Sequence, residues 1–159
     1  MKQRDALLQT LGDTLRARGA MLVTAESCTG GLIAATCTSV AGSSDWFERG
    51  FVTYSNAAKT EMLGVAAALI AQHGAVSAEV AAAMAEGALL HSRGDLAVAV
   101  TGIAGPAGAV PGKPVGTVWL AVARRGAAAQ AELLQLGGDR TAVREQTVVR
   151  ALQRLVDEL

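Results

Sequence analysis

The chain has 159 residues, of which 51% are hydrophobic and only 3% aromatic, and its 14 lysines and arginines are balanced by 14 aspartates and glutamates. This balance argues against a general binder of nucleic acid or of an anionic membrane surface, because proteins of either kind carry an excess of basic residues on their binding surface. No apolar run approaches the roughly 18 residues of a membrane span and no signal-peptide pattern is present, so we expect a single cytoplasmic domain over residues 1–159.

Helical and strand patterns alternate along the chain. From Asp5 to Ala17 four leucines fall on one helical stripe, and the apolar run from Met21 to Ala25 is typical of a buried strand. Further helices are predicted over 32–40, 56–63, 66–72 and 78–91, and from Asp139 or Thr141 to the C-terminus. Further strands are predicted over 51–54, 95–100, 115–123 and 129–136, the last two as an antiparallel pair.

This order of elements predicts an α/β fold, a three-layer α/β/α sandwich with a mixed, mostly parallel sheet. In open sheets of this kind the binding site lies outside the carboxyl ends of the parallel strands. Two glycine-rich turns, 24–31 and 101–106, follow predicted strands at such ends. We therefore expect both turns to face one pocket.

The first of these turns, TAESCTGG, leads from a strand into a helix. Ser27 and Cys28 are both candidate nucleophiles, because a sharp strand-to-helix turn exposes a side chain, and a thiolate at a helix N-terminus has a lowered pKa. Backbone N–H groups around Thr29, Gly30 and Gly31 suit substrate binding, as donors to an oxyanion or a phosphate. The alternative is a tight turn in which Thr29 or Ser27 caps the helix.

A tyrosine and a lysine follow the next predicted strand. Tyr54 closes that strand, and Lys59 lies one turn into the helix that comes after it. A lysine that burial or nearby cations keep neutral accepts a proton from a serine, and a phenol relays or orients that proton. The alternative for Lys59 is a solvated side chain on a helix surface.

The second glycine turn, TGIAGP, offers the Thr101 hydroxyl and a backbone at Gly102 that a ligand can approach closely. It matches neither a Walker A loop nor a dinucleotide fingerprint, and plain turn chemistry stays an alternative. Further along, Arg140 follows Gly-Gly-Asp at the start of the last helix. A guanidinium there can clamp a phosphate, or it can lie idle in solvent.

The cysteines and histidines show no metal-ligand spacing. Cys28 and Cys37 are expected to be free thiols in a reducing compartment, and His73 and His91 stand apart from other ligands. We therefore expect neither a metal site nor a cofactor.

Several unusual blocks occur together in this chain. They are TAESCTGG (24–31), AGSSDWFERGFVTYSN (41–56), HGAVS (73–77), TGIAGP (101–106), KPVGTVW (113–119) and GDR (138–140). In this order and spacing they resemble the CinA C-terminal domain family, and more closely its stand-alone nicotinamide-nucleotide amidohydrolases. The resemblance covers nearly the whole chain.

The resemblance implies hydrolysis of the carboxamide of nicotinamide mononucleotide, which yields nicotinate mononucleotide and ammonia without a metal or cofactor. It implies a serine nucleophile at Ser27, whose proton Lys59 takes directly or through Tyr54. It also implies a homodimer or a higher homo-oligomer. The ribose and phosphate are expected to contact some of four residues: Ser44, Thr101, Gly102 and Arg140.

Three alternatives stay open at this point. Cys28 rivals Ser27 as the nucleophile. A chain can also keep a fold and lose its chemistry, which would leave a non-catalytic nucleotide-binding or adaptor domain. Finally, the amide that is hydrolysed can belong to a different small metabolite.

Overall fold

The computed structural model describes residues 2–159, which form six α-helices, one short 3₁₀ helix and a five-stranded sheet. The helices are α1 (Lys2–Arg18), α2 (Leu32–Cys37), η1 (Ser43–Asp45), α3 (Asn56–Leu63), α4 (Ala67–His73), α5 (Ala78–Leu90) and α6 (Arg140–Glu158). The strands are β1 (Leu22–Glu26), β2 (Phe47–Val52), β3 (Leu96–Gly102), β4 (Thr117–Arg124) and β5 (Gln130–Gln135). No helix in this described part of the chain is both long and apolar enough to cross a membrane.

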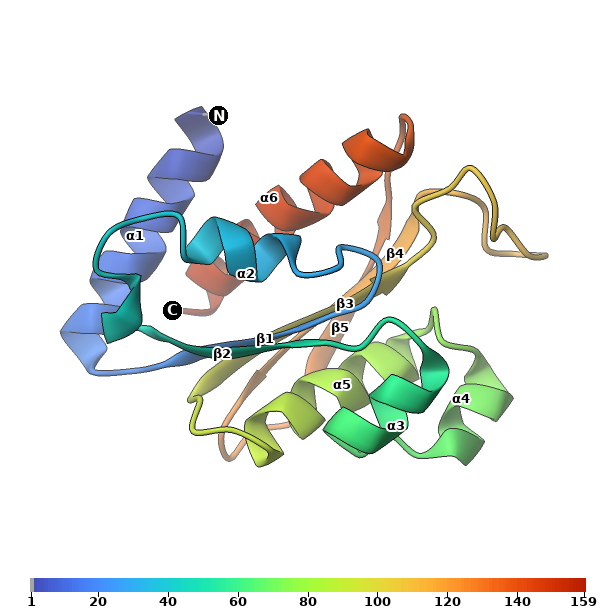
Figure 1. Cartoon of the computed structure of the whole chain (residues 1–159), viewed down its shortest axis with the longest axis horizontal. Helices are drawn as coiled ribbons and strands as arrows, with labels where there is room; N and C mark the ends of the chain where they lie inside the picture. The colour runs from blue at the N-terminus through green and yellow to red at the C-terminus, as the bar shows by residue number, and fades with distance from the viewer. Residues whose placement is uncertain (1) are drawn as a thin grey trace.

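The sheet has the strand order β2-β1-β3-β4-β5. β1 pairs in parallel with β2 and with β3, whereas β4 is antiparallel to both β3 and β5. Helices α1, α2 and α6 cover one face of the sheet, and α3, α4 and α5 lie on the other (Figure 1). The predicted three-layer α/β/α sandwich with a mixed sheet is confirmed, including the antiparallel pair near the C-terminus.

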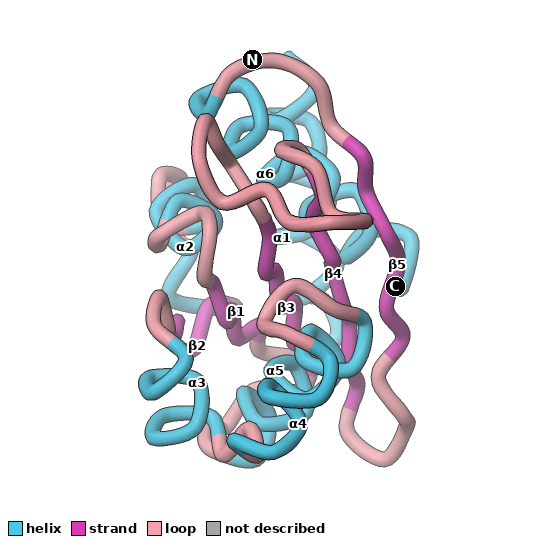
Figure 2. Tube along the Cα trace, turned by 90° about the vertical axis from the view of Figure 1, so that its right-hand side faces the viewer, coloured by secondary structure: helices cyan, strands magenta, loops and turns pink. Residues whose placement is uncertain are grey.

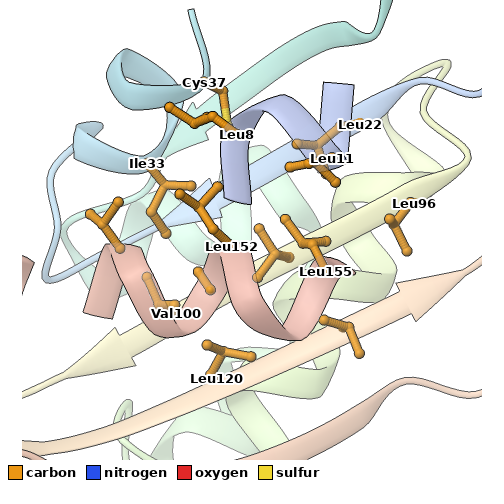
Figure 3. Packing of buried hydrophobic residues seen from close by; sticks show 14 of the residues in the cluster. Leu8, Leu11, Leu22, Ile33, Cys37, Leu96, Val100, Leu120, Leu152 and Leu155 are labelled. Carbon is orange, nitrogen blue, oxygen red and sulfur yellow. The ribbon is translucent and has the colours of Figure 1, made fainter. Parts of the chain in front are cut away.

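Leucines of α1 and α6 fill the first of two cores. Leu11 of α1 is fully buried there with Leu152 and Leu155 of α6, against Leu120 of β4 (Figure 3). Burying each such side chain contributes roughly 1.5–3 kcal/mol. The apolar face of α6 is therefore the face turned toward the sheet.

The second core is built from small side chains of α5 and the sheet. Ala81, Ala85 and Ala88 of α5 are buried with a set of strand alanines: Ala25, Ala97, Ala99, Ala121 and Ala123. Because these side chains are short, α5 lies close to the sheet, and α3 and α4 pack around it (Figure 1). This arrangement brings the start of α3 to the carboxyl ends of β1 and β2.

The helix predicted over 32–40 is shorter in the structure and ends at Cys37. The hydroxyls of Thr36 and Thr38 donate to carbonyl oxygens one turn earlier, at 2.7 and 2.9 Å, and Ser39 donates to a carbonyl at 2.6 Å. Side chains that bond helix carbonyls in this way compete with continued helix formation. The prediction missed this competition.

The strand predicted over 51–54 runs instead from Phe47 to Val52. It is one of the two edge strands of the sheet, and its residues are half-buried or exposed along its whole length. Charged residues such as Glu48 and Arg49 are common on edge strands, where they discourage pairing with another chain. The first half of β2 therefore lacks the apolar signal on which the prediction depended.

Gly87 lies where α5 meets the end of α3. A methyl group at this position would overlap the Leu63 carbonyl oxygen and lie 3.1 Å from Leu63 Cβ. At exposed positions in helices, replacing glycine by alanine stabilises the helix by about 1 kcal/mol. At this packed position we expect Gly87→Ala instead to lower the free energy of unfolding by about 1–3 kcal/mol. Urea unfolding measures the change, and Gly137→Ala is the control because its methyl meets no atom within 4 Å. An unchanged midpoint for Gly87→Ala would contradict this packing.

Candidate active site

The carboxyl ends of the three parallel strands meet at one edge of the sheet, which Figure 2 views from outside. A cavity of about 240 Å³ opens there. It is lined by Ser27, Cys28, Tyr54, Asn56, Lys59, Ala75, Val76, Thr101, Gly102, Ala104 and Arg140. The structure thus brings the two glycine-rich turns to one pocket, together with six of the ten residues that the sequence proposed as catalytic or substrate-binding.

The centre of this cavity is a buried serine–lysine pair. Ser27 directly follows β1, and its Oγ lies 3.1 Å from the Nζ of Lys59. The exposed fractions are 8% for Ser27 and 1% for Lys59. The Ser55 hydroxyl caps α3 by accepting a hydrogen bond from the Ala58 N–H, which fixes the helix start that carries Lys59. Because Lys59 is buried, the alternative that it is a solvated side chain on a helix surface is excluded.

The surroundings of Lys59 favour a neutral amine. Burial lowers the pKa of Lys59 below its usual value of 10.5, against a smaller opposing effect of Cys28. Besides Ser27, the Nζ contacts the backbone oxygens of Thr53 at 3.2 Å and Tyr54 at 3.4 Å. A neutral amine has two N–H donors for these carbonyls and one lone pair left for the Ser27 hydroxyl proton. In this geometry a neutral amine can accept the proton of the serine hydroxyl.

Cys28 lies beside this pair but its thiol stays protonated. Burial raises the pKa of Cys28 to about 11, and the charge of Glu26 adds to the shift, while its own backbone N–H and the charge of Arg144 oppose it. The expectation that the helix N-terminus lowers the pKa of this thiol is therefore wrong. Cys28 lacks the thiolate that a cysteine nucleophile requires at neutral pH.

Glu26 closes the N-terminus of α2 from inside the protein. This fully buried carboxylate accepts hydrogen bonds from the Ile33 N–H at 2.8 Å, the Ala34 N–H at 3.0 Å and the Thr29 hydroxyl at 2.5 Å. The free N–H groups at the start of α2 therefore donate to Glu26 and are not available to a ligand. A charged residue at the end of an apolar strand, just before a helix, was the available signal, since a buried carboxylate needs such partners.

The turn residues predicted to bind substrate lie outside the cavity lining. The Thr29 hydroxyl is bonded to Glu26, and the Gly30 N–H donates to the Ser27 carbonyl at 3.1 Å. Gly31 adopts a positive φ of 105° as the residue that precedes α2. The structure therefore gives these three residues a role in shaping the turn, and it does not bring them to the pocket.

Tyr54 and Arg140 form the mouth of the cavity. The Tyr54 side chain is exposed (64%), and its phenol oxygen accepts a hydrogen bond from Arg140 Nη2 at 3.4 Å. Arg140 Nη1 donates to the Gly105 carbonyl at 2.9 Å. It is the Tyr54 backbone, and not its phenol, that contacts Lys59. The expected proton relay through the phenol is therefore absent from this geometry.

Three further predicted residues have different positions. The Thr101 hydroxyl donates to the Ala75 carbonyl at 2.9 Å and so holds the segment that forms one cavity wall. A side chain at Gly102 would approach Thr117 O to 2.9 Å, so this glycine permits the pairing of β3 with β4. Ser44 lies in η1, ahead of the first residue of β2, and so at the opposite edge of the sheet. It is not brought to the pocket.

Sequence reasoning overlooked two residues at this site. Asn56, the first residue of α3, lines the cavity, and its place directly after the predicted Tyr54 could have indicated it. Arg144 of α6 donates to the carbonyl oxygens of Cys28 and Thr29, and no local sequence signal indicates this contact. Within residues 2–159, no three histidine, cysteine, aspartate or glutamate side chains stand together as metal ligands would.

The fold and this geometry define an α/β/α protein with a buried serine–lysine pair at the carboxyl edge of its sheet. In proteins that use such a pair, the lysine amine activates the serine hydroxyl. The chain belongs to the CinA C-terminal domain family, whose model matches residues 4–159.

Relatives of known name cover most of this chain. It is 54% identical over 149 residues to the nicotinamide-nucleotide amidohydrolase PncC of Escherichia coli K12, covering 94% of this chain and 90% of that protein. The enzyme of the same name from Pseudomonas putida is 55% identical over 150 residues, with 94% and 93% covered. The crystal structure of the competence/damage inducible protein CihA from Agrobacterium tumefaciens superposes with a TM-score of 0.95 at 46% identity, covering 98% and 94%.

Proposed function

We propose that this chain is a nicotinamide-nucleotide amidohydrolase, which converts nicotinamide mononucleotide to nicotinate mononucleotide and ammonia. The observation that carries the proposal is the 3.1 Å contact between Ser27 Oγ and the buried Lys59 Nζ. The names of the relatives from Escherichia coli and Pseudomonas putida, at 54% and 55% identity over nearly the full chain, support this substrate.

The geometry supports a two-step acyl transfer. Neutral Lys59 takes the proton of the Ser27 hydroxyl while Ser27 Oγ attacks the carboxamide carbon. The protonated Lys59 then gives its proton to the leaving nitrogen, so that ammonia departs and an ester with Ser27 remains. Water, activated by the same amine, cleaves that ester and releases the carboxylate product. Lys59 ends each cycle in its starting protonation state.

A second cavity, of about 460 Å³, adjoins the first and shares Ala104 and Arg140 with it. Its other lining residues are Pro106, Val115, Gly138, Asp139 and Thr141. With the nicotinamide ring directed at Ser27, this neighbouring space is where the ribose and phosphate fit. Arg140, at the junction, is the residue that we propose to bind the phosphate.

Loss of this guanidinium should weaken substrate binding more than catalysis. For Arg140→Met we expect the KM for nicotinamide mononucleotide to rise about 10- to 100-fold, the effect of losing a hydrogen bond to a charged group. The comparison substrate is nicotinamide riboside, which lacks the phosphate, and its KM should change far less. Equal increases for both substrates would mean that Arg140 does not contact the phosphate.

The proposed reaction is tested by incubating the purified protein with nicotinamide mononucleotide and measuring ammonia together with nicotinate mononucleotide. Equal amounts of both products are expected. A folded protein that binds the nucleotide in a calorimetric titration but releases no ammonia would instead be a binding module. Ammonia from another small amide, but not from the nucleotide, would move the activity to a different substrate.

We also propose that residues 1–159 act as one domain, in the cytoplasm, as a homodimer or higher homo-oligomer. A single sheet with a core on each face supports the first of these proposals. Sedimentation equilibrium of the purified chain measures the oligomeric state directly.

A further inference from the structure

The guanidinium of Arg144, on α6, contacts the turn that carries the proposed nucleophile. Its Nε donates to the carbonyl oxygen of Cys28 at 3.2 Å, and its Nη2 donates to that of Thr29 at 3.0 Å. Gly30 adopts a positive φ of 60°, and a side chain there would lie 3.6 Å from Arg144 Nη2. The planar guanidinium of Arg144 thus binds the carbonyls of two consecutive peptide groups, those of Cys28 and Thr29. The absence of a side chain at Gly30 leaves room for it beside the turn.

These two contacts orient the backbone around Ser27. In a trans peptide the C=O and the N–H of the next residue point in opposite directions, so a contact that fixes one fixes the other. The Thr29 carbonyl is held by Arg144, and the N–H of the same peptide, that of Gly30, donates to the Ser27 carbonyl at 3.1 Å. On its other side, the Ser27 N–H donates to Val100 of β3 at 3.1 Å. Arg144 is therefore one peptide group away from Ser27 itself.

The other restraints act on Thr29 and the residues after it, and they include the hydrogen bond of the Thr29 hydroxyl to Glu26 at 2.5 Å. Glu26 holds the first turn of α2 through Ile33 and Ala34, and the Leu32 N–H also donates to the Thr29 carbonyl, at 3.0 Å. Between residues 2 and 159 the Cys28 carbonyl accepts a hydrogen bond from Arg144 and from no other group. The Cys28–Thr29 peptide, the second one after the proposed nucleophile, thus depends on Arg144 for its orientation.

We propose that Arg144 is a positioning residue for the nucleophile. It fixes the peptides after Ser27 so that the Ser27 hydroxyl stays within hydrogen-bond distance of Lys59 Nζ. The inference rests on the proposed function, because it gives Ser27 the role of nucleophile. Arg144 lies outside the lining of both cavities and so acts through the turn, without contact to the substrate. Small displacements of a reacting group cost up to about 100-fold in rate.

A purely structural anchor would behave differently from a positioning residue. If Arg144 only tied α6 to the sheet, its loss would reduce the fraction of folded, binding-competent protein, and the rate would fall in the same proportion. A positioning residue leaves binding intact and lowers kcat for every folded molecule. The number of nucleotide binding sites per chain separates the two cases.

The experiment compares the wild type with Arg144→Met, Arg144→Lys and the control Arg150→Met, an exposed arginine of the same helix. We expect Arg144→Met to lower kcat for nicotinamide mononucleotide about 30- to 100-fold, with KM within twofold and calorimetric stoichiometry unchanged. Arg144→Lys keeps a donor near the two carbonyls and should recover part of the loss. Arg150→Met should match the wild type.

A second arm places Arg144→Met in the Ser27→Ala background, where it should cause no further loss of the residual rate. The positioning role would be overturned if Arg144→Met kept the wild-type kcat, or if its kcat fell only in proportion to the loss of nucleotide binding sites per chain. Either result would leave the proposed function standing. A wild type that binds the nucleotide without releasing ammonia would overturn both.

Discussion

Ser27→Ala is expected to remove ammonia release from nicotinamide mononucleotide almost completely, by about 10⁴-fold or more, the scale of losing a serine nucleophile. Cys28→Ala should retain most of the activity. The two residues are adjacent, yet only the Ser27 oxygen lies 3.1 Å from the proposed base. Burial raises the pKa of the Cys28 thiol to about 11, so no reactive thiolate forms at neutral pH.

Both variants are assayed under identical conditions, after circular dichroism has established that each is folded. Cys28 is buried, so Cys28→Ser, which keeps a similar volume, serves as the second control if the alanine variant is unstable. Ammonia release that survives Ser27→Ala but disappears in both Cys28 variants would assign the nucleophile to the thiol and reject the proposed mechanism.

Lys59→Met is expected to lower kcat by about 10²–10⁴-fold, the usual contribution of a general base. Lys59→Arg should be equally impaired, because a guanidinium keeps its proton at any workable pH. This pair of variants separates a base from a fixed positive charge, which arginine would preserve. Lys113→Met is the matched control, since Lys113 donates to the His73 carbonyl away from the cavity lining.

The pH dependence of kcat/KM follows from the same lysine. Only neutral Lys59 accepts a proton, so the wild-type rate should rise with pH as the amine is deprotonated and level off above its pKa. Because burial lowers the pKa of Lys59, the midpoint of this rise should fall below 10.5. Lys59→Met should lack this rise in its residual rate. An unchanged profile in Lys59→Met, or full activity in Lys59→Arg, would exclude Lys59 as the base.

Much of the fold follows from local patterns that the sequence displays openly. The leucine stripe of α1 and the apolar run of β1 each predict their element, and the structure confirms both. The order of these elements also predicts three layers and one shared pocket for the two glycine-rich turns, 24–31 and 101–106. Such features depend on residues that are close in the chain, or on rules of connection that hold for any open sheet.

The tertiary structure decided what each side chain at that edge contacts. The pattern alone allowed either Ser27 or Cys28 to be the nucleophile, and only burial and the position of Lys59 distinguish them. Likewise, the sequence pattern allowed an anion to bind at the N-terminus of α2, but in the structure the Glu26 carboxylate accepts hydrogen bonds from the N–H groups there.

Distance along the chain explains the remaining differences. Arg144 lies 116 residues from Cys28, and Arg140 lies 86 residues from Tyr54, so no local residue spacing predicts either contact. Ser44 is close to Tyr54 in sequence, but β2 separates them and carries them to opposite edges of the sheet. The sequence by itself determined the elements, their order and the chemical groups available. Folding decided which of those groups meet, because hydrogen bonds and burial at the site join segments that only the packed sheet and helices bring together.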